Sequence, residues 1–193
     1  AAVPTPEQAI MAAQVAAVRK ELERARAEGK LGHYKAARAI AEPVLAAARA
    51  TKYPAVIAEA GLELGQLQQQ LGDAAAVDTL RDAMHMAEQA GDSATTIHAA
   101  AWLTFTLTMR TSQYDRAQEV AGFAEAAAAH QMPPMDIYVR LQDVIALLDE
   151  EQSHYDAAQA RYEKTLALAE EKLGRDHAGT LTTLNQLATV YRD

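Results

Sequence analysis

A short turn-like sequence recurs through the chain at nearly constant spacing. In three of its four copies a Tyr follows the first residue by two positions, and an Ala follows that Tyr by three. A fixed period of roughly 20–50 residues is typical of a repeat array, in which each repeat is one supersecondary unit. We therefore expect a solenoid of stacked repeats. The four copies begin 40, 40 and 41 residues apart, at Gly32, Gly72, Ser112 and Ser153.

The composition indicates that these repeats are helical. Half of the residues are hydrophobic, mainly Ala and Leu, and only 5% are aromatic. Such a mixture favours helix, and no segment alternates apolar and polar residues as a half-buried strand would. We predict a single all-α domain over residues 1–193, with repeats at about 6–51, 54–90, 93–131 and 134–173 and a half repeat at 178–193. The predicted helices are at about 6–29, 34–51, 54–71, 75–90, 93–111, 114–131, 134–152, 155–173 and 178–192.

The fourth turn and the segment after it carry the most specific pattern. It consists of Tyr155-x-x-Ala158, L-G-R-D-H at 173–177, and T-L-N-Q-L-A-T-V-Y at 183–191. This pattern resembles a tetratricopeptide repeat (TPR), and within that superfamily the longer repeat of the kinesin light chains. Two positions depart from the family pattern: Gln186 replaces the second Asn, and Ala178 stands where a Pro usually follows the His.

The resemblance implies a right-handed superhelix of antiparallel helix pairs with about four and a half repeats. HEAT and armadillo arrays have similar periods. We prefer TPR because Leu64-Gly65 places a small residue where the two helices of a repeat cross, and because of the recurring Tyr-x-x-Ala. The arrangement also resembles the region that follows the kinase domain in some bacterial serine/threonine kinases. Since the chain ends inside a repeat, we expect it to be a piece of a larger signalling protein.

Charge and motif content argue against several functional classes. The formal net charge of −8 disfavours a nucleic-acid partner, which needs a basic face. The chain has no Cys, no apolar run near the roughly 20 residues of a membrane span, no phosphate-binding Gly-rich loop and no His pair at metal-ligand spacing. We therefore expect no catalytic residue, no cofactor, no metal site and no membrane partner, and we expect a cytoplasmic location.

The concave face of a stacked array is the surface with functional promise. In the resembled family, the first helix of each repeat lines this groove. Trp102, the sole Trp, is placed there, although core or subunit packing is the alternative role for such a residue. The predicted peptide-binding set is Glu59, Glu63, Gln66, Gln70, Trp102, Thr106, Arg110, Arg140, Asn185 and Gln186.

Relatives that clamp a C-terminal carboxylate use convergent Lys, Arg and Asn side chains along this groove. The matching positions here hold Glu59, Glu63, Leu103 and Leu147, so we do not expect capture of that type. The predicted function is a protein–protein interaction scaffold that binds a peptide or partner segment. Two alternatives stay open: self-association through the C-terminal half repeat, and regulation of an attached kinase.

The pattern also makes three predictions about packing. The basic residues between 19 and 30 form a solvated face whose ion pairs lie within their own helix. In the half repeat, Leu184, Leu187 and Tyr191 are exposed because their partner helix is missing. The Tyr of each turn is buried beside the Ala three residues on, in the pairs Tyr34 and Ala37, Tyr114 and Ala117, and Tyr155 and Ala158.

Overall fold

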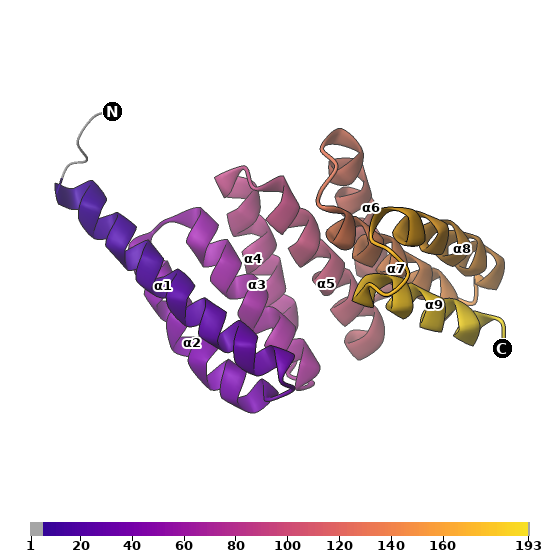
Figure 1. Ribbon diagram of the computed structural model, residues 1–193, viewed down its shortest axis with the longest axis horizontal. Coiled ribbons are helices and arrows are strands. Elements are labelled where there is room, and N and C mark those ends of the chain that lie inside the picture. Colours follow the sequence, from indigo (N-terminus) through magenta and orange to yellow (C-terminus); the bar gives the residue numbers. More distant parts are fainter. Residues whose placement is uncertain (1–5, 193) are drawn as a thin grey trace. The chain divides into compact units, whose positions relative to one another are not determined.

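The computed structural model describes residues 6–192, and over this range it consists of helices joined by short turns, with no strand. Figure 1 shows the nine helices of these residues in chain order. Each predicted helix is present, and its ends lie within two residues of the predicted ones. The helices are α1 (Pro6–Lys30), α2 (Tyr34–Thr51), α3 (Pro54–Gln70), α4 (Ala76–Ala90), α5 (Ser93–Thr111), α6 (Tyr114–His130), α7 (Met135–Glu151), α8 (Tyr155–Lys172) and α9 (Ala178–Val190).

The recurring turn has a common backbone geometry. All four of its first residues adopt positive φ, at 78° for Gly32, 71° for Gly72, 49° for Ser112 and 64° for Ser153. A left-handed residue just past a helix end lets the next backbone N–H groups bond to carbonyls of the last turn. The N–H of His33, for example, donates to the carbonyl of Glu28 at 3.0 Å. The turn that recurs in the sequence therefore marks the residues at which helices end.

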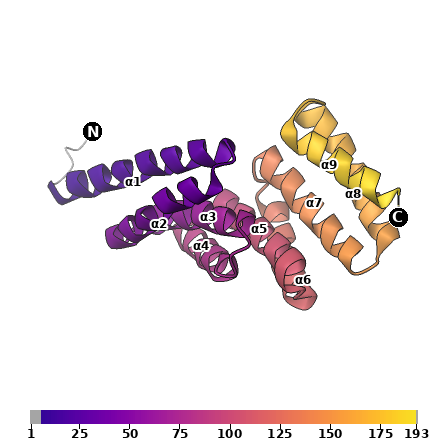
Figure 2. The ribbon, with the colours of Figure 1, turned by 90° about the horizontal axis from the view of Figure 1, so that it is seen from below.

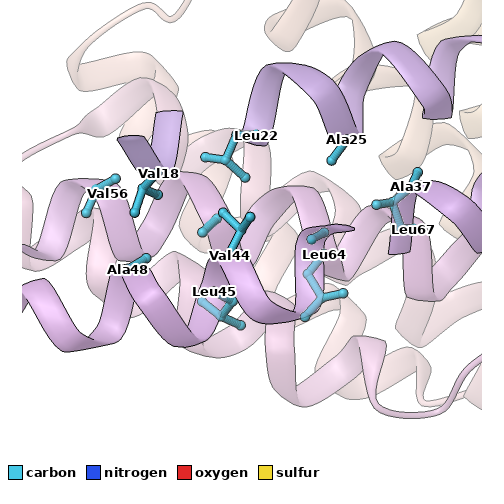
Figure 3. Close-up of a cluster of buried hydrophobic side chains, with 12 residues drawn as sticks. Val18, Leu22, Ala25, Ala37, Val44, Leu45, Ala48, Val56, Leu64 and Leu67 are labelled. Atoms are coloured by element: carbon cyan, nitrogen blue, oxygen red, sulfur yellow. The ribbon is translucent and has the colours of Figure 1, made fainter. Parts of the chain in front are cut away.

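The described residues form two compact units that divide between Thr95 and Thr96, near the start of α5, and we describe each unit separately. In the N-terminal unit α2 packs on α1, α3 packs on both, and α4 packs on α3. Figure 3 shows the core shared by the first three helices, in which Leu22 is completely buried. Its other large members are Val18, Val44, Leu45, Val56, Leu64 and Leu67.

The predicted close crossing within the second repeat is confirmed. A Cβ atom built on Gly65 of α3 would lie 2.6 Å from two side-chain carbons of Leu80 on α4, well inside contact distance. One turn earlier, a Cβ on Gly61 would lie 3.0 Å from the Cβ of Ala83. Glycine is thus required at residue 65 by the approach of two helices, whereas the turn glycines are favoured by a backbone conformation that Ser112 and Ser153 also adopt.

In the C-terminal unit, α7 packs against α6, α8 and α9, and α8 packs against α9 (Figure 2). Tyr162 of α8 is completely buried and packs with Ala146, Ala158 and Leu187. Leu187 therefore belongs to the core, and its predicted exposure was wrong. Its side chain faces α8, which supplies a partner even without a further helix. The predictions for Leu184 and Tyr191 are confirmed, at 47% and 61% exposed.

The predicted burial of the turn tyrosines was also wrong. Tyr34 is 37% exposed and Tyr155 is 50% exposed, and Tyr114 is only half-buried. Each Tyr is the first residue of its helix. Its ring therefore lies at the end of the helix, where fewer neighbouring residues cover it. The alanines three residues later point inward, and all three, Ala37, Ala117 and Ala158, are completely buried as predicted.

Candidate functional site

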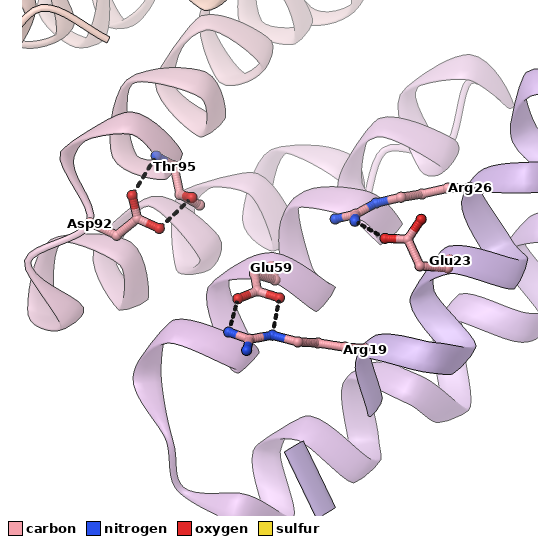
Figure 4. Close-up of polar contacts among 6 residues, drawn as sticks. All are labelled: Arg19, Glu23, Arg26, Glu59, Asp92 and Thr95. Atoms are coloured by element: carbon pink, nitrogen blue, oxygen red, sulfur yellow. Dashed lines mark hydrogen bonds and ion pairs between the residues drawn. The ribbon is translucent and has the colours of Figure 1, made fainter. Parts of the chain in front are cut away.

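Two carboxylates of the predicted groove, Glu59 and Glu63 on α3, are bound by arginines of α1. Arg19 forms a bidentate pair with Glu59, with its Nη2 2.6 Å from Oε1 and its Nε 3.0 Å from Oε2 (Figure 4). Arg26 places its Nε 3.0 Å from Oε2 of Glu63. The first helices of two repeats are thus joined by ion pairs, and these carboxylates are engaged by protein donors.

The prediction that the basic stretch of α1 pairs only within its own helix was partly wrong. Arg24 does pair with Glu21, and Arg26 with Glu23, three residues away. Arg26 also reaches Glu63, whose side chain is largely buried, and this burial raises the pKa of Glu63 while the hydrogen bond from Arg26 opposes the rise. The spacing of residues along one helix predicts the ion pairs within α1. The ion pairs with α3 exist only because α3 packs against α1.

The rest of the α3 set is more open. Gln66 is half-buried and Gln70 is exposed. At the other end of α3, residues of α1 and the residue before α3 line an open pocket of about 740 Å³. Its lining is mainly apolar, and its charged members are of both signs: Arg19, Lys20 and Glu23.

The C-terminal unit holds a second cluster, centred on Trp102 of α5. The guanidinium carbon of Arg140, on α7, lies 4.4 Å from the centroid of the Trp102 ring, in a cation–π contact. The indole Nε1–H donates to Nε2 of His98 at 3.2 Å, and Phe105 meets the ring edge-on with centroids 6.0 Å apart. The ring is half-buried. Trp102 is thus held in one orientation by three neighbours and keeps part of its surface open.

Arg140 differs from the other arginines in what its N–H groups contact. Arg161, for comparison, donates to Glu125 and Gln142, each at 2.8 Å. Within residues 6–192, Arg140 has the Trp102 stacking contact and no ion pair or hydrogen bond to a side chain. The residue as a whole is exposed, but burial of the guanidinium lowers the pKa of Arg140, and the charges of Asp143 and Asp136 oppose this shift. A guanidinium held by its face and without a side-chain hydrogen bond can receive a planar oxyanion in bidentate fashion.

One turn further along α7, Asp143 is only 8% exposed. The Thr183 hydroxyl of α9 donates to this carboxylate and lies 2.9 Å from both of its oxygens. Burial raises the pKa of Asp143 to about 7, and the Thr183 hydrogen bond and the nearby Arg140 charge oppose the rise without cancelling it. The junction of α7 and α9 therefore contains an acidic group that titrates near neutral pH.

The remaining predicted residues are in different environments. Thr106 is 1% exposed, and its hydroxyl donates to the backbone carbonyl of Trp102 at 2.8 Å. It is therefore part of the interior beneath Trp102 and has no surface for a ligand to contact. Arg110 and Asn185 are exposed and Gln186 is half-buried. Over the described residues, no three His, Asp or Glu side chains are grouped closely enough to hold a metal ion. None of the described helices is both long and apolar enough to cross a membrane.

Residues 140–193 match the family model of the tetratricopeptide repeat. A crystal structure of nearly identical TPR-like repeats from Podosopora anserina, from a protein assigned as a kinesin light chain, superimposes with a TM-score of 0.68. Sequence identity is 19%, and the match covers 92% of this chain and 87% of that chain. A form of those repeats with a Gln replaced by Met gives a TM-score of 0.70 at 19% identity and covers 92% and 86% of the two chains. The fold is that of a TPR array.

No curated protein matches the sequence. TPR repeats generally mediate protein–protein interactions, and the matched segment contains Arg140, Asp143 and Thr183. Helical spacing in the sequence places Trp102 and Arg140 in the predicted site but not Arg19, Asp143 or Thr183. The repeat period is the signal that could have found them, because Arg19 and Glu59, like Asp143 and Thr183, are 40 residues apart. Equivalent positions in successive repeats lie side by side when repeats stack.

Proposed function

We propose that this TPR array binds a partner polypeptide at the surface formed by Trp102 and Arg140, and that the bound segment presents an acidic side chain next to an apolar one. The observation that carries the proposal is the Arg140 guanidinium, which stacks on the indole and has no side-chain hydrogen bond or ion pair within residues 6–192. An ordered side chain loses little conformational entropy on binding, so its hydrogen bonds contribute more to affinity. The partner's carboxylate would accept hydrogen bonds from the N–H groups of Arg140. The apolar side chain next to it would pack against the exposed part of the Trp102 ring.

The net charge of the chain favours binding through one specific ion pair over binding through long-range attraction between the whole chain and its partner. The chain carries a formal net charge of −8, so an acidic segment gains little from long-range attraction. A specific pair formed next to an aromatic surface can still be strong, because partial desolvation strengthens the charge-assisted hydrogen bond. Arg110, Asn185 and the α3 set remain candidates for weaker contacts. Regulation of an attached kinase would be a special case, in which the bound segment belongs to the same polypeptide.

The test uses Trp102 fluorescence, which reports on the site directly because the chain has one Trp. Peptides selected on the intact protein from a random display library should be enriched in Asp or Glu next to an apolar residue. Truncation of a central anchor typically costs about 2 kcal/mol, so Arg140→Ala should weaken these peptides about thirtyfold. Arg140→Lys should recover only part of that loss, because Lys lacks the bidentate donor edge.

Arg116→Ala is the matched control, since Arg116 is exposed on α6 and, within residues 6–192, its side chain hydrogen-bonds to the nearby Gln113 side chain alone. It should leave the affinity unchanged. Selected peptides without acidic residues, or peptides that bind Arg140→Ala as tightly as the parent, would show that the Trp102 surface is not the binding site.

A further inference from the structure

The junction of α7 and α9 holds a carboxyl group that the proposed binding surface does not use. Asp143 is 8% exposed, and its hydrogen-bond partner Thr183 is completely buried. Within residues 6–192, no Lys, Arg or His side chain forms an ion pair with Asp143. Burial without an ion pair favours the neutral form of a carboxyl group, and it raises the pKa of Asp143 to about 7.

The hydrogen bonds of this junction can accommodate Asp143 in either protonation state. The Thr183 hydroxyl oxygen lies 2.9 Å from both carboxyl oxygens of Asp143 and 3.1 Å from the backbone carbonyl oxygen of Gly179. A hydroxyl has one hydrogen to donate, so it serves the carboxylate when Asp143 is ionised. When Asp143 is protonated, its O–H can donate to the Thr183 oxygen, and the Thr183 hydroxyl can donate to Gly179. Asp143 can therefore gain or lose a proton while α7 and α9 stay in place.

Arg140 and Asp143 are close enough for each charge to act on the other. They are three residues apart on α7, a spacing that puts both on one side of the helix. Burial lowers the pKa of Arg140, and the Asp143 charge opposes this shift; the Arg140 charge likewise opposes the rise that burial causes in the pKa of Asp143. An ionised Asp143 therefore offsets part of the positive charge that a bound carboxylate would meet at Arg140.

Other charged or titratable side chains near this pair come from α7 and from the helices in contact with it. They are Asp136, Asp149 and Glu150 on α7, Glu125 on α6, Arg161 and Tyr162 on α8, and His98 beside Trp102 on α5. The helix α9, Ala178–Val190, has no titratable side chain. Glu125 pairs with Arg161, and burial raises the pKa of Tyr162, so this phenol stays neutral. Histidine can gain a proton near neutral pH, so the effect of His98 has to be separated from that of Asp143.

We propose that Asp143 takes up a proton when an acidic segment binds at Arg140, so that this surface holds its partner more tightly below neutral pH than above it. The proposal rests on the function proposed above. An ionised Asp143 repels the incoming carboxylate and partly neutralises Arg140, whereas a protonated Asp143 does neither. Because linkage is reciprocal, the bound carboxylate must favour protonation of Asp143 by the same factor. Asp143 is thus a positioning residue that acts through Arg140.

The coupling of the two charges can be measured without a partner. Carbon-13 NMR of the side-chain carboxyl groups in the intact chain, over a pH series, gives the titration midpoint of Asp143. Arg140→Met keeps an unbranched side chain on Trp102 and removes the charge, so it should move this midpoint upward by about one pH unit. Arg116→Ala, which removes an exposed charge on α6, should leave the midpoint unchanged. A midpoint that Arg140→Met leaves in place would overturn the proposal.

The effect on binding is measured with the tightest acidic peptide from the display selection. Titrations followed by Trp102 fluorescence should give an affinity about tenfold higher at pH 5.5 than at pH 8.5, the ratio that corresponds to one unit of pKa. Asp143→Asn imitates the protonated acid, so it should bind at pH 8.5 as tightly as the parent does at pH 5.5. The same peptide with its Asp and Glu residues replaced by Asn and Gln should bind equally at both pH values.

Two further variants assign the pH dependence to Asp143. His98→Gln removes the neighbouring imidazole, and Asp136→Asn removes an exposed carboxylate near Arg140. Each should keep the tenfold ratio even where it changes the affinity at both pH values, and circular dichroism should show every variant folded at both. Equal affinity of the parent at both pH values, or a ratio that survives in Asp143→Asn or vanishes in His98→Gln, would overturn this proposal alone. A peptide that binds Arg140→Ala as tightly as the parent would overturn the proposed function, and this proposal with it.

Discussion

Gly65→Val should lower the free energy of unfolding by about 3 kcal/mol or more, because the new side chain has no room between α3 and α4. A Cβ at this position lies 2.6 Å from the Cγ and Cδ2 atoms of Leu80, and the backbone nitrogen of Leu80 follows at 3.4 Å. Leu80 is completely buried, so it cannot swing into solvent to make space. The two helices must move apart, and the packing of the second repeat is lost.

Gly122→Ala is the matched control for this prediction. Gly122 lies inside α6, and a Cβ there meets nothing within 4 Å. Alanine in an unhindered helix position should raise the free energy of unfolding by about 0.5–1 kcal/mol, since it restricts the unfolded chain more than glycine does. Urea unfolding followed by circular dichroism measures both changes. If Gly65→Val were as stable as the parent, the close crossing of α3 and α4 would be refuted.

Asp143→Asn should stabilise the protein above neutral pH by on the order of 4 kcal/mol relative to its effect at pH 4. The pKa of Asp143 is raised from 3.8 to about 7 by burial in the junction of α7 and α9. Each unit of pKa shift corresponds to about 1.4 kcal/mol between the two protonation states. Asparagine is close in shape and still accepts the hydrogen bond from Thr183, but it carries no charge to desolvate.

The direction of the pH dependence follows from which state holds the proton. Well below pH 4, Asp143 is protonated in both the folded and the unfolded state and contributes no difference. Between pH 4 and 7 the unfolded chain has released this proton while the folded chain still binds it, so stability falls as the pH rises. Above pH 7 the carboxylate is ionised in both states, and the loss is complete. The nearby Arg140 charge limits the loss, since it favours the ionised form.

Urea unfolding of the parent and of Asp143→Asn between pH 4 and 8.5 measures this dependence. The difference in unfolding free energy should grow through the interval from pH 4 to 7 and then level off. Asp136→Asn, an exposed change of the same chemistry in the first turn of α7, should show no comparable growth. A constant difference between Asp143→Asn and the parent at every pH would show that Asp143 is not a buried acid with a raised pKa.

The sequence by itself determined the repeat architecture of the described residues, because the signals for it are local. The turn at Gly32, Gly72, Ser112 and Ser153 depends on residues that stop a helix and accept positive φ. Helix content follows from an Ala- and Leu-rich composition, and the small side chain at Gly65 follows from the pattern of one repeat. Helix ends, the positions of Ala37, Ala117 and Ala158, and the absence of strands in residues 6–192 needed no knowledge of distant contacts.

Only the tertiary structure decided which side chains remain available to a partner. Sequence spacing places Glu59, Glu63 and Thr106 on a groove face, yet two are bound by arginines of α1 and the third is buried. The exposure of Tyr34 and the burial of Leu187 depend equally on which neighbouring helix covers each position. Arg140 stands out because it stacks on Trp102 and has no ion pair or side-chain hydrogen bond within residues 6–192. Periodicity along one helix tells which residues share a face, whereas exposure and pairing depend on what is stacked against that face.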